Sequence, residues 1–89
     1  MEFPFDQVIN EGKLIRTFLP DVDVEELKWH QDLKDRKVKI LEGDDWYFQF
    51  EDQLPNKLSI NQEILIPKFV WHRVIKGNSK LVVEILELD

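Results

Sequence analysis

The sequence predicts an all-β sandwich or barrel, and three observations indicate it. Short segments in which apolar and polar residues alternate with a period of two follow one another along the chain. Each segment is bounded by Gly, Pro, Asn or Asp, the residues that favour turns. The spacing between segments is short, which leaves little room for helices. We expect one domain over residues 1–89, with strands at 13–18, 26–31, 36–41, 46–50, 57–60, 63–66, 71–76 and 80–88.

The boundaries of these elements follow from local chemistry. The first element is expected to be a short helix at residues 5–11 that ends at Gly12. Residues 42–45 and 76–79 have the composition of hairpin turns. The prolines at positions 20, 55 and 67 fall at strand ends, where the missing N–H removes no hydrogen bond from a sheet.

The composition excludes several classes of function. The 89 residues include no cysteine, so a metal could bind only through imidazole, carboxylate and water. The formal net charge is −6, with Lys and Arg interspersed among more numerous acids, so we expect no nucleic-acid partner. No apolar run approaches the roughly 20 residues of a membrane span, and the first residues lack the features of a signal peptide. We therefore expect a cytosolic protein without a membrane partner.

The two histidines, His30 and His72, predict a metal site together with Asp32. A His-x-Asp pair followed 40 residues later by a single His has the composition of the facial triad that holds non-haem Fe(II) with open coordination positions. Residues two apart in a strand project from the same face, so His30 and Asp32 could converge on one point. The alternative is that His30 is a half-buried strand residue, Asp32 begins a polar turn and His72 lies at a strand end. The residues alone leave both interpretations open, and they single out no catalytic acid, base or nucleophile.

The stretch from Trp29 to Ile75 resembles the cupin superfamily. The first cupin motif is Gly, five residues, His-x-His, three or four residues, Glu, six residues, Gly. In this chain the corresponding positions hold Val24, His30, Asp32, Arg36 and Gly43. The second motif retains its Pro and His, as Pro67 and His72, but has Asn61, Phe69 and Lys76 where cupins have Gly, Gly and Asn. The whole chain more loosely resembles compact single-domain cupins of marine T4-like phages.

The resemblance implies a small double-stranded β-helix, a jelly-roll barrel with its metal inside. It makes His30 and His72 the histidine ligands, with Asp32 in place of the usual second His of the first motif. The implied cofactor is a divalent metal; Fe(II) is favoured, with Ni, Mn or Zn as alternatives. If the protein is an enzyme, the resemblance favours dioxygenase-type chemistry.

Arg36 stands where cupins have a ligating Glu, and it cannot ligate because it remains protonated. Alternation places Arg36 on the same face as Val38 and Ile40, which should be the interior. A buried Arg needs a partner, and three are conceivable: Asp32, the carboxylate of a small acidic ligand, or a carboxylate from the surface. The ligand would make the protein an enzyme or a sensor. The Asp32 pair would make it a non-catalytic barrel that serves dimerisation or the binding of another protein.

The resemblance also implies that Tyr47 and Gln49 face inward and contribute to substrate binding. Trp46, Phe48 and Phe50 would then form an aromatic ridge on the outer face. Such a ridge must be covered, either by the N-terminal segment or by a second subunit. We therefore expect a homodimer that uses this face.

Overall fold

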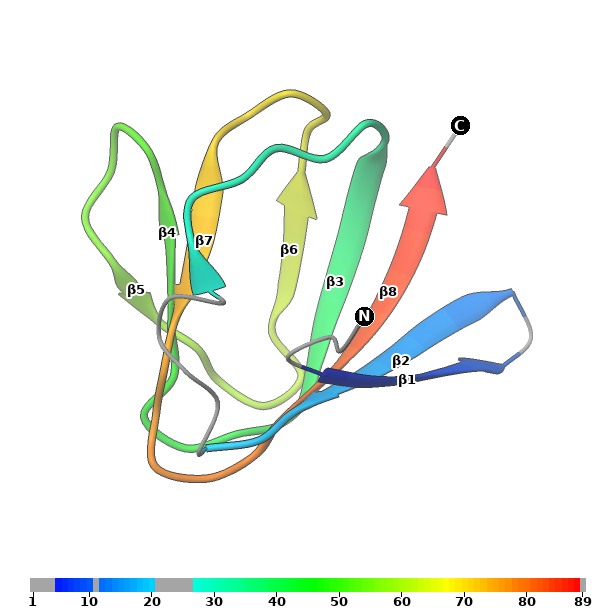
Figure 1. The fold of residues 1–89 in the computed structure, drawn as a ribbon, viewed down its shortest axis with the longest axis vertical. Coiled ribbons are helices and arrows are strands. Elements are labelled where there is room, and N and C mark those ends of the chain that lie inside the picture. Colours follow the sequence, from blue (N-terminus) through cyan, green and yellow to red (C-terminus); the bar gives the residue numbers. More distant parts are fainter. Residues whose placement is uncertain (1–4, 11, 21–26, 89) are drawn as a thin grey trace.

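The fold is all-β, as predicted. The computed structural model describes residues 5–10, 12–20 and 27–88, and these residues form eight strands and no α-helix. None of them belongs to a helix long and apolar enough to span a membrane. Figure 1 shows the strands arranged as two sheets that face each other. The strands are β1 (Phe5–Asn10), β2 (Lys13–Phe18), β3 (Asp35–Glu42), β4 (Tyr47–Phe50), β5 (Asn56–Lys57), β6 (Glu63–Ile66), β7 (His72–Ile75) and β8 (Leu81–Leu88).

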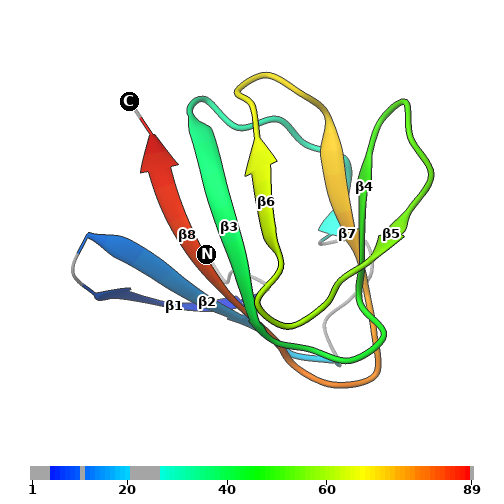
Figure 2. The ribbon, with the colours of Figure 1, turned by 180° about the vertical axis from the view of Figure 1, so that it is seen from behind.

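Both sheets are antiparallel. The larger has the strand order β1-β2-β8-β3-β6, and the smaller has the order β5-β4-β7. The chain passes between the sheets at β3–β4, β5–β6, β6–β7 and β7–β8. Figure 2 shows from behind that the β6–β7 loop lies at the opposite end of the sheets from the β3–β4 and β7–β8 loops. This arrangement is the cupin or jelly-roll type of fold. The apolar inner faces of the two sheets enclose the core between them.

Six of the eight predicted strands are confirmed, and those at 26–31 and 57–60 are the exceptions. The predictions at 13–18, 36–41, 46–50, 63–66, 71–76 and 80–88 correspond to β2, β3, β4, β6, β7 and β8. At 57–60 only Lys57 is in a strand, as the second residue of β5. At 26–31 no strand forms among residues 27–31, and residue 26 lies outside the described residues. That segment contributes a single bridge at His30, described below.

The predicted helix at residues 5–11 is wrong, because residues 5–10 form β1. This strand pairs with β2 along its whole length, from Phe5 opposite Phe18 to Asn10 opposite Lys13. An isolated helix of seven residues is marginal in water, whereas the edge of β2 offers a full row of backbone partners. Gly12 has a φ of 80°, so it ends the element as predicted, but in a hairpin. Residue 11 lies outside the described residues.

The side chains of β4 point in the directions opposite to those predicted, with Phe48 inside instead of Tyr47 and Gln49. Trp46 is fully buried and Phe48 is 6% exposed, and both belong to the core. Tyr47 and Gln49 therefore point to the other face. Burying one large apolar side chain stabilises a fold by about 1.5–3 kcal/mol, whereas an inward Gln would need hydrogen-bond partners in the core. Gln49 finds its partner outside, where its Oε1 accepts a 2.9 Å hydrogen bond from Arg73 Nε.

Candidate metal centre

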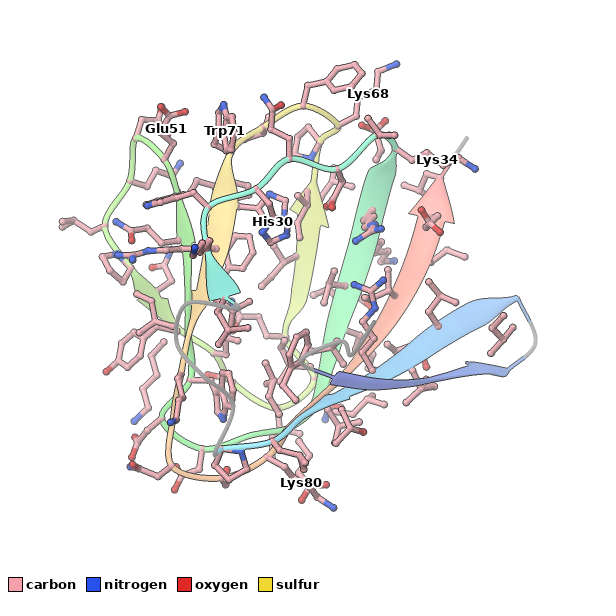
Figure 3. The ribbon with its side chains drawn as sticks, in the orientation of Figure 1. His30, Lys34, Glu51, Lys68, Trp71 and Lys80 are labelled. Atoms are coloured by element: carbon pink, nitrogen blue, oxygen red, sulfur yellow. The ribbon has the colours of Figure 1, made fainter. Side chains whose placement is uncertain are left out.

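His30 and His72 lie directly opposite each other on neighbouring backbone segments. The N–H of His30 donates to the carbonyl of His72, and the N–H of His72 donates to the carbonyl of His30, each over 3.0 Å. This reciprocal pair attaches the irregular segment that contains His30 to the edge of β7. The two rings stand edge to face with centroids 4.3 Å apart. In Figure 3, His30 lies between β7 and β6 as seen in this view.

Asp32 is held in place by the turn that precedes β7. Its carbonyl accepts a 2.9 Å hydrogen bond from the N–H of Phe69. The side chain of Gln31 donates to the carbonyl of Phe69 over 2.8 Å. Phe69 has a φ of 65°, a left-handed conformation that is uncommon for a bulky residue. Both backbone groups of Phe69 thus hold the 31–32 segment, and the Asp32 side chain is buried.

His30, Asp32 and His72 can each offer one ligand atom, and these three atoms lie within 4.8 Å of one another. His72 Nε2 is 3.3 Å from Asp32 Oδ2. Metal bonds of about 2.0–2.2 Å that meet at roughly 90–110° would place ligand atoms about 3–3.5 Å apart. His72 Nε2 and Asp32 Oδ2 already have this spacing. The structure brings together the three residues that the sequence predicts as ligands.

Both histidines are oriented through their other ring nitrogen. His30 Nδ1 lies 2.9 Å from the carbonyl of Lys28, and His72 Nδ1 lies 2.9 Å from the carbonyl of Val70. A carbonyl can only accept, so Nδ1 must hold the proton in each ring. In a neutral imidazole, Nε2 then has the free lone pair. This is the arrangement by which metal-ligating histidines are fixed in one tautomer.

Asp32 Oδ2 is buried and accepts no aligned hydrogen bond within the described part of the chain. If His72 is neutral, the lone pairs of Nε2 and Oδ2 face each other across 3.3 Å. That arrangement requires a cation, either a second proton on His72 or a metal ion. Burial raises the pKa of Asp32, but the contact with His72 and the charges of Arg36, His72 and His30 together hold this pKa below its usual value. An ionised carboxylate whose buried Oδ2 accepts no aligned hydrogen bond and lies 3.3 Å from His72 Nε2 fits a divalent cation.

Arg36 faces the interior, as predicted, and contacts two carboxylates. Its Nη1 is 3.2 Å from Asp32 Oδ1, and its Nη2 is 3.6 Å from Glu87 Oε2. Its Nε is buried without a hydrogen-bond partner among the described residues. Asp32 therefore offers one oxygen to Arg36 and the other to the histidine side. A salt bridge to Arg36 and ligation of a metal, predicted as alternatives, use different oxygens and are compatible.

The three candidate ligands and Arg36 line a cavity of about 640 Å³ between the sheets. Its wall is mostly apolar, formed by core side chains such as Ile40, Phe48 and Val83. The sequence prediction missed Arg16, which also lines this cavity. Alternation along β2 contained the signal, because Arg16 lies between Leu14 and Phe18 on one face. The polar and charged residues of the wall are Arg16, Lys28, His30, Asp32, Arg36 and His72.

Tyr47 and Gln49, predicted to bind substrate, do not line the cavity. Phe48 lies between them in sequence and takes the inward position, where its ring stacks on that of His72 with centroids 5.6 Å apart. Side chains alternate between the two faces of a strand, so an inward Phe48 requires that Tyr47 and Gln49 point outward.

No protein-family model matches the chain, and no curated protein matches its sequence. Similar solved structures include the DMSP lyase DddQ from Ruegeria pomeroyi, with a TM-score of 0.77 and 17% identity over 98% of this chain and 47% of that one. HppE with Fe(II) has a TM-score of 0.67 and 15% identity over 94% and 48%. A protein described as a putative mannose-6-phosphate isomerase from Ralstonia eutropha has a TM-score of 0.66 and 18% identity over 96% and 82%.

These proteins share the cupin fold, and at such identities the likeness shows the fold alone. The chain spans about half the length of DddQ and of HppE.

Proposed function

We propose that this chain is a metal-binding cupin barrel in which His30, Asp32 and His72 hold one divalent ion. The observation that carries the proposal is the buried, unsatisfied Oδ2 of Asp32, which lies 3.3 Å from Nε2 of a histidine whose proton is held on Nδ1. Fe(II) is the favoured ion because two imidazoles and one carboxylate match the facial triad. The similarity to HppE, a protein with Fe(II), supports this choice. Ni, Mn and Zn are the alternatives.

At such a site, different residues of this chain would bind the metal, bind the ligand and exclude water. Three protein ligands leave coordination positions open, where a bound ion acts as a Lewis acid and, if it is Fe(II), supports dioxygenase-type chemistry. Arg36 would hold the carboxylate of a small acidic ligand. The apolar wall of the cavity would bury the remainder of that ligand and exclude water. The protein would then be an enzyme or a sensor of that ligand.

Metal binding is tested by elemental analysis of protein purified without a His tag, followed by calorimetric titration with Co(II) as a stand-in for Fe(II). We expect one ion per chain in the wild type and its loss in Asp32→Asn. The matched control is Asp52→Asn, which removes an exposed carboxylate from the turn after β4. Absence of a Co(II) isotherm in the wild type, or equal binding by both variants, would contradict the proposal.

A second candidate is a barrel without metal that serves as an interaction module. The contacts of Arg36 with Asp32 and Glu87 favour it, because they neutralise the guanidinium without any ligand. The same titration separates the two, since this candidate binds no ion. A homodimer remains a proposal that light scattering can test, but burial of Trp46 and Phe48 removes the aromatic ridge that motivated it.

A further inference from the structure

Residues 28–31 form an exposed strip between two buried residues, Leu27 and Asp32. The strip carries His30, and it is joined to β7 by the reciprocal backbone pair of His30 and His72. Hydrogen bonds at an exposed site contribute little net free energy, whereas fixing each residue of the strip costs conformational entropy. The strip therefore needs side-chain contacts to stay closed against β7.

Trp29 makes such a contact with β7. The guanidinium carbon of Arg73 lies 4.8 Å from the centroid of the Trp29 ring. Arg73 does not line the cavity, whereas its strand neighbours His72 and Val74 do. Arg73 is therefore on the outer face of β7, and the contact joins the strip to β7 from outside the barrel.

The guanidinium of Arg73 is itself held in place. Its Nε donates a 2.9 Å hydrogen bond to Oε1 of Gln49, the residue opposite it in the pairing of β4 with β7. Gln49 Nε2 donates in turn to the carbonyl of Gln53 over 2.9 Å. A guanidinium that is already oriented loses less freedom when an indole packs against it. A cation over a partly exposed Trp ring is worth a factor of about two to five in an equilibrium constant.

We propose that Trp29 and Arg73 are positioning residues that keep His30 among the metal ligands. This inference rests on the proposed function, because it takes His30 as a ligand of the ion. When the strip opens locally, His30 leaves the site, while the side chains of Asp32 and His72 remain buried. The apparent metal affinity then falls with the fraction of molecules in which the strip is closed. The pair of Trp29 and Arg73 should thus raise the affinity for the ion without contacting it.

The first test uses the protein without metal. Hydrogen exchange at the His30 amide, followed by NMR, measures opening of the strip, because this N–H donates to the carbonyl of His72. The Ile40 amide, which donates to the carbonyl of Gln62, reports on the rest of the fold. In Trp29→Ala we expect exchange at His30 to be at least about three-fold faster, with exchange at Ile40 within about two-fold of the wild type. Trp29→Tyr keeps an aromatic face and should retain part of the protection.

Variants of Arg73 and Trp71 identify the contact responsible. Arg73→Met keeps the length of the side chain but removes its charge and its Nε–H donor. It should accelerate exchange at His30 as Trp29→Ala does, and the double variant should add little, because both changes remove the same contact. The matched control is Trp71→Ala, since Trp71 is 43% exposed against 37% for Trp29 and its ring contacts no cation in the described part of the chain. Exchange at His30 should be unchanged in this control.

Titration with Co(II) then connects the pair to the ligand. We expect Trp29→Ala to weaken Co(II) binding by about three- to ten-fold. In a protein that already carries His30→Ala, the same change should alter Co(II) affinity by less than about two-fold, because the ligand that Trp29 positions is absent. A purely structural role of Trp29 would weaken Co(II) binding equally in both backgrounds.

The outcomes separate this inference from the proposed function. If the wild type binds no Co(II), the proposed function fails, and the role of Trp29 and Arg73 in metal binding fails with it. If Co(II) binds but exchange at His30 is unchanged in Trp29→Ala, the positioning role alone is overturned. A loss of Co(II) affinity that is equal with and without His30, or equal in Trp29→Ala and Trp71→Ala, would overturn it as well.

Discussion

His30 and His72 hydrogen-bond each other through both backbone groups, at 3.0 Å in each direction. This pairing brings two residues 42 positions apart in the sequence to the same point, although the segment around His30 forms no regular strand. The pairing depends on backbone atoms, so the side chains can be changed without removing it. The ligand assignment can therefore be tested separately from the fold.

The two histidines should respond differently to truncation. His30 is exposed, so His30→Ala should change the free energy of unfolding by less than about 1 kcal/mol while weakening Co(II) binding by at least about 100-fold. His72 is 3% exposed and stacks on Phe48, so His72→Ala should lose metal and also about 1–3 kcal/mol of stability. Urea denaturation and Co(II) titration measure both effects. Unchanged Co(II) affinity in His30→Ala would remove His30 from the ligand set.

Arg36→Glu should make the fold depend on metal. The change places a third carboxylate beside Asp32 and Glu87, and breaking this largely buried ion pair should cost about 3–5 kcal/mol without metal. The melting temperature should fall by more than about 10 °C and should recover when Co(II) neutralises the cluster. Arg36→Met, which removes the charge without adding an acid, is the matched control. Recovery by Co(II) that is no larger than in the wild type would show that the new carboxylate does not face the ion.

Phe69 should be replaceable with a gain in stability. Its left-handed φ of 65° costs about 1 kcal/mol for a bulky residue, and the residue is 56% exposed. Phe69→Asn should stabilise the protein by about 0.5–1 kcal/mol, because Asn tolerates this conformation and keeps the backbone groups that hold residues 31–32. Phe69→Ala removes the ring but keeps the strain, so it should bring no gain. Thermal denaturation of both variants measures the difference.

Asp45 should contribute to the loss of stability in acid. Side-chain hydrogen bonds from Lys57 and Asn78 lower its pKa, so its contribution is present above the unfolded value near pH 4 and is lost as the pH falls through the folded value. Asp45→Asn keeps a residue that tolerates its φ of 59° but removes the titration. Stability of this variant should therefore fall less between pH 6 and pH 3 than that of the wild type. A parallel pH profile in the two proteins would exclude Asp45 as a source of acid sensitivity.

The sequence alone determined the fold class, most strands and the three candidate metal ligands. Alternation with a period of two is set by the geometry of an extended chain, so it is visible without a structure. It placed Arg36 on the inner face with Val38 and Ile40, and the structure agrees. The histidines could be selected because they are the only two in the chain.

The tertiary structure decided those features that require contacts between residues far apart in the sequence. Alternation defines two faces of the segment 46–50 but does not say which face is inside. Packing against the other sheet decides this, because it buries Trp46 and Phe48. Residues 5–10 became a strand because β2 offered them an edge, and local propensity contains no such information. The pairing of His30 with His72, and the place of Arg16 in the same cavity, likewise arise where the two sheets meet. Such contacts are properties of the packed chain, because each requires a partner that only folding brings near.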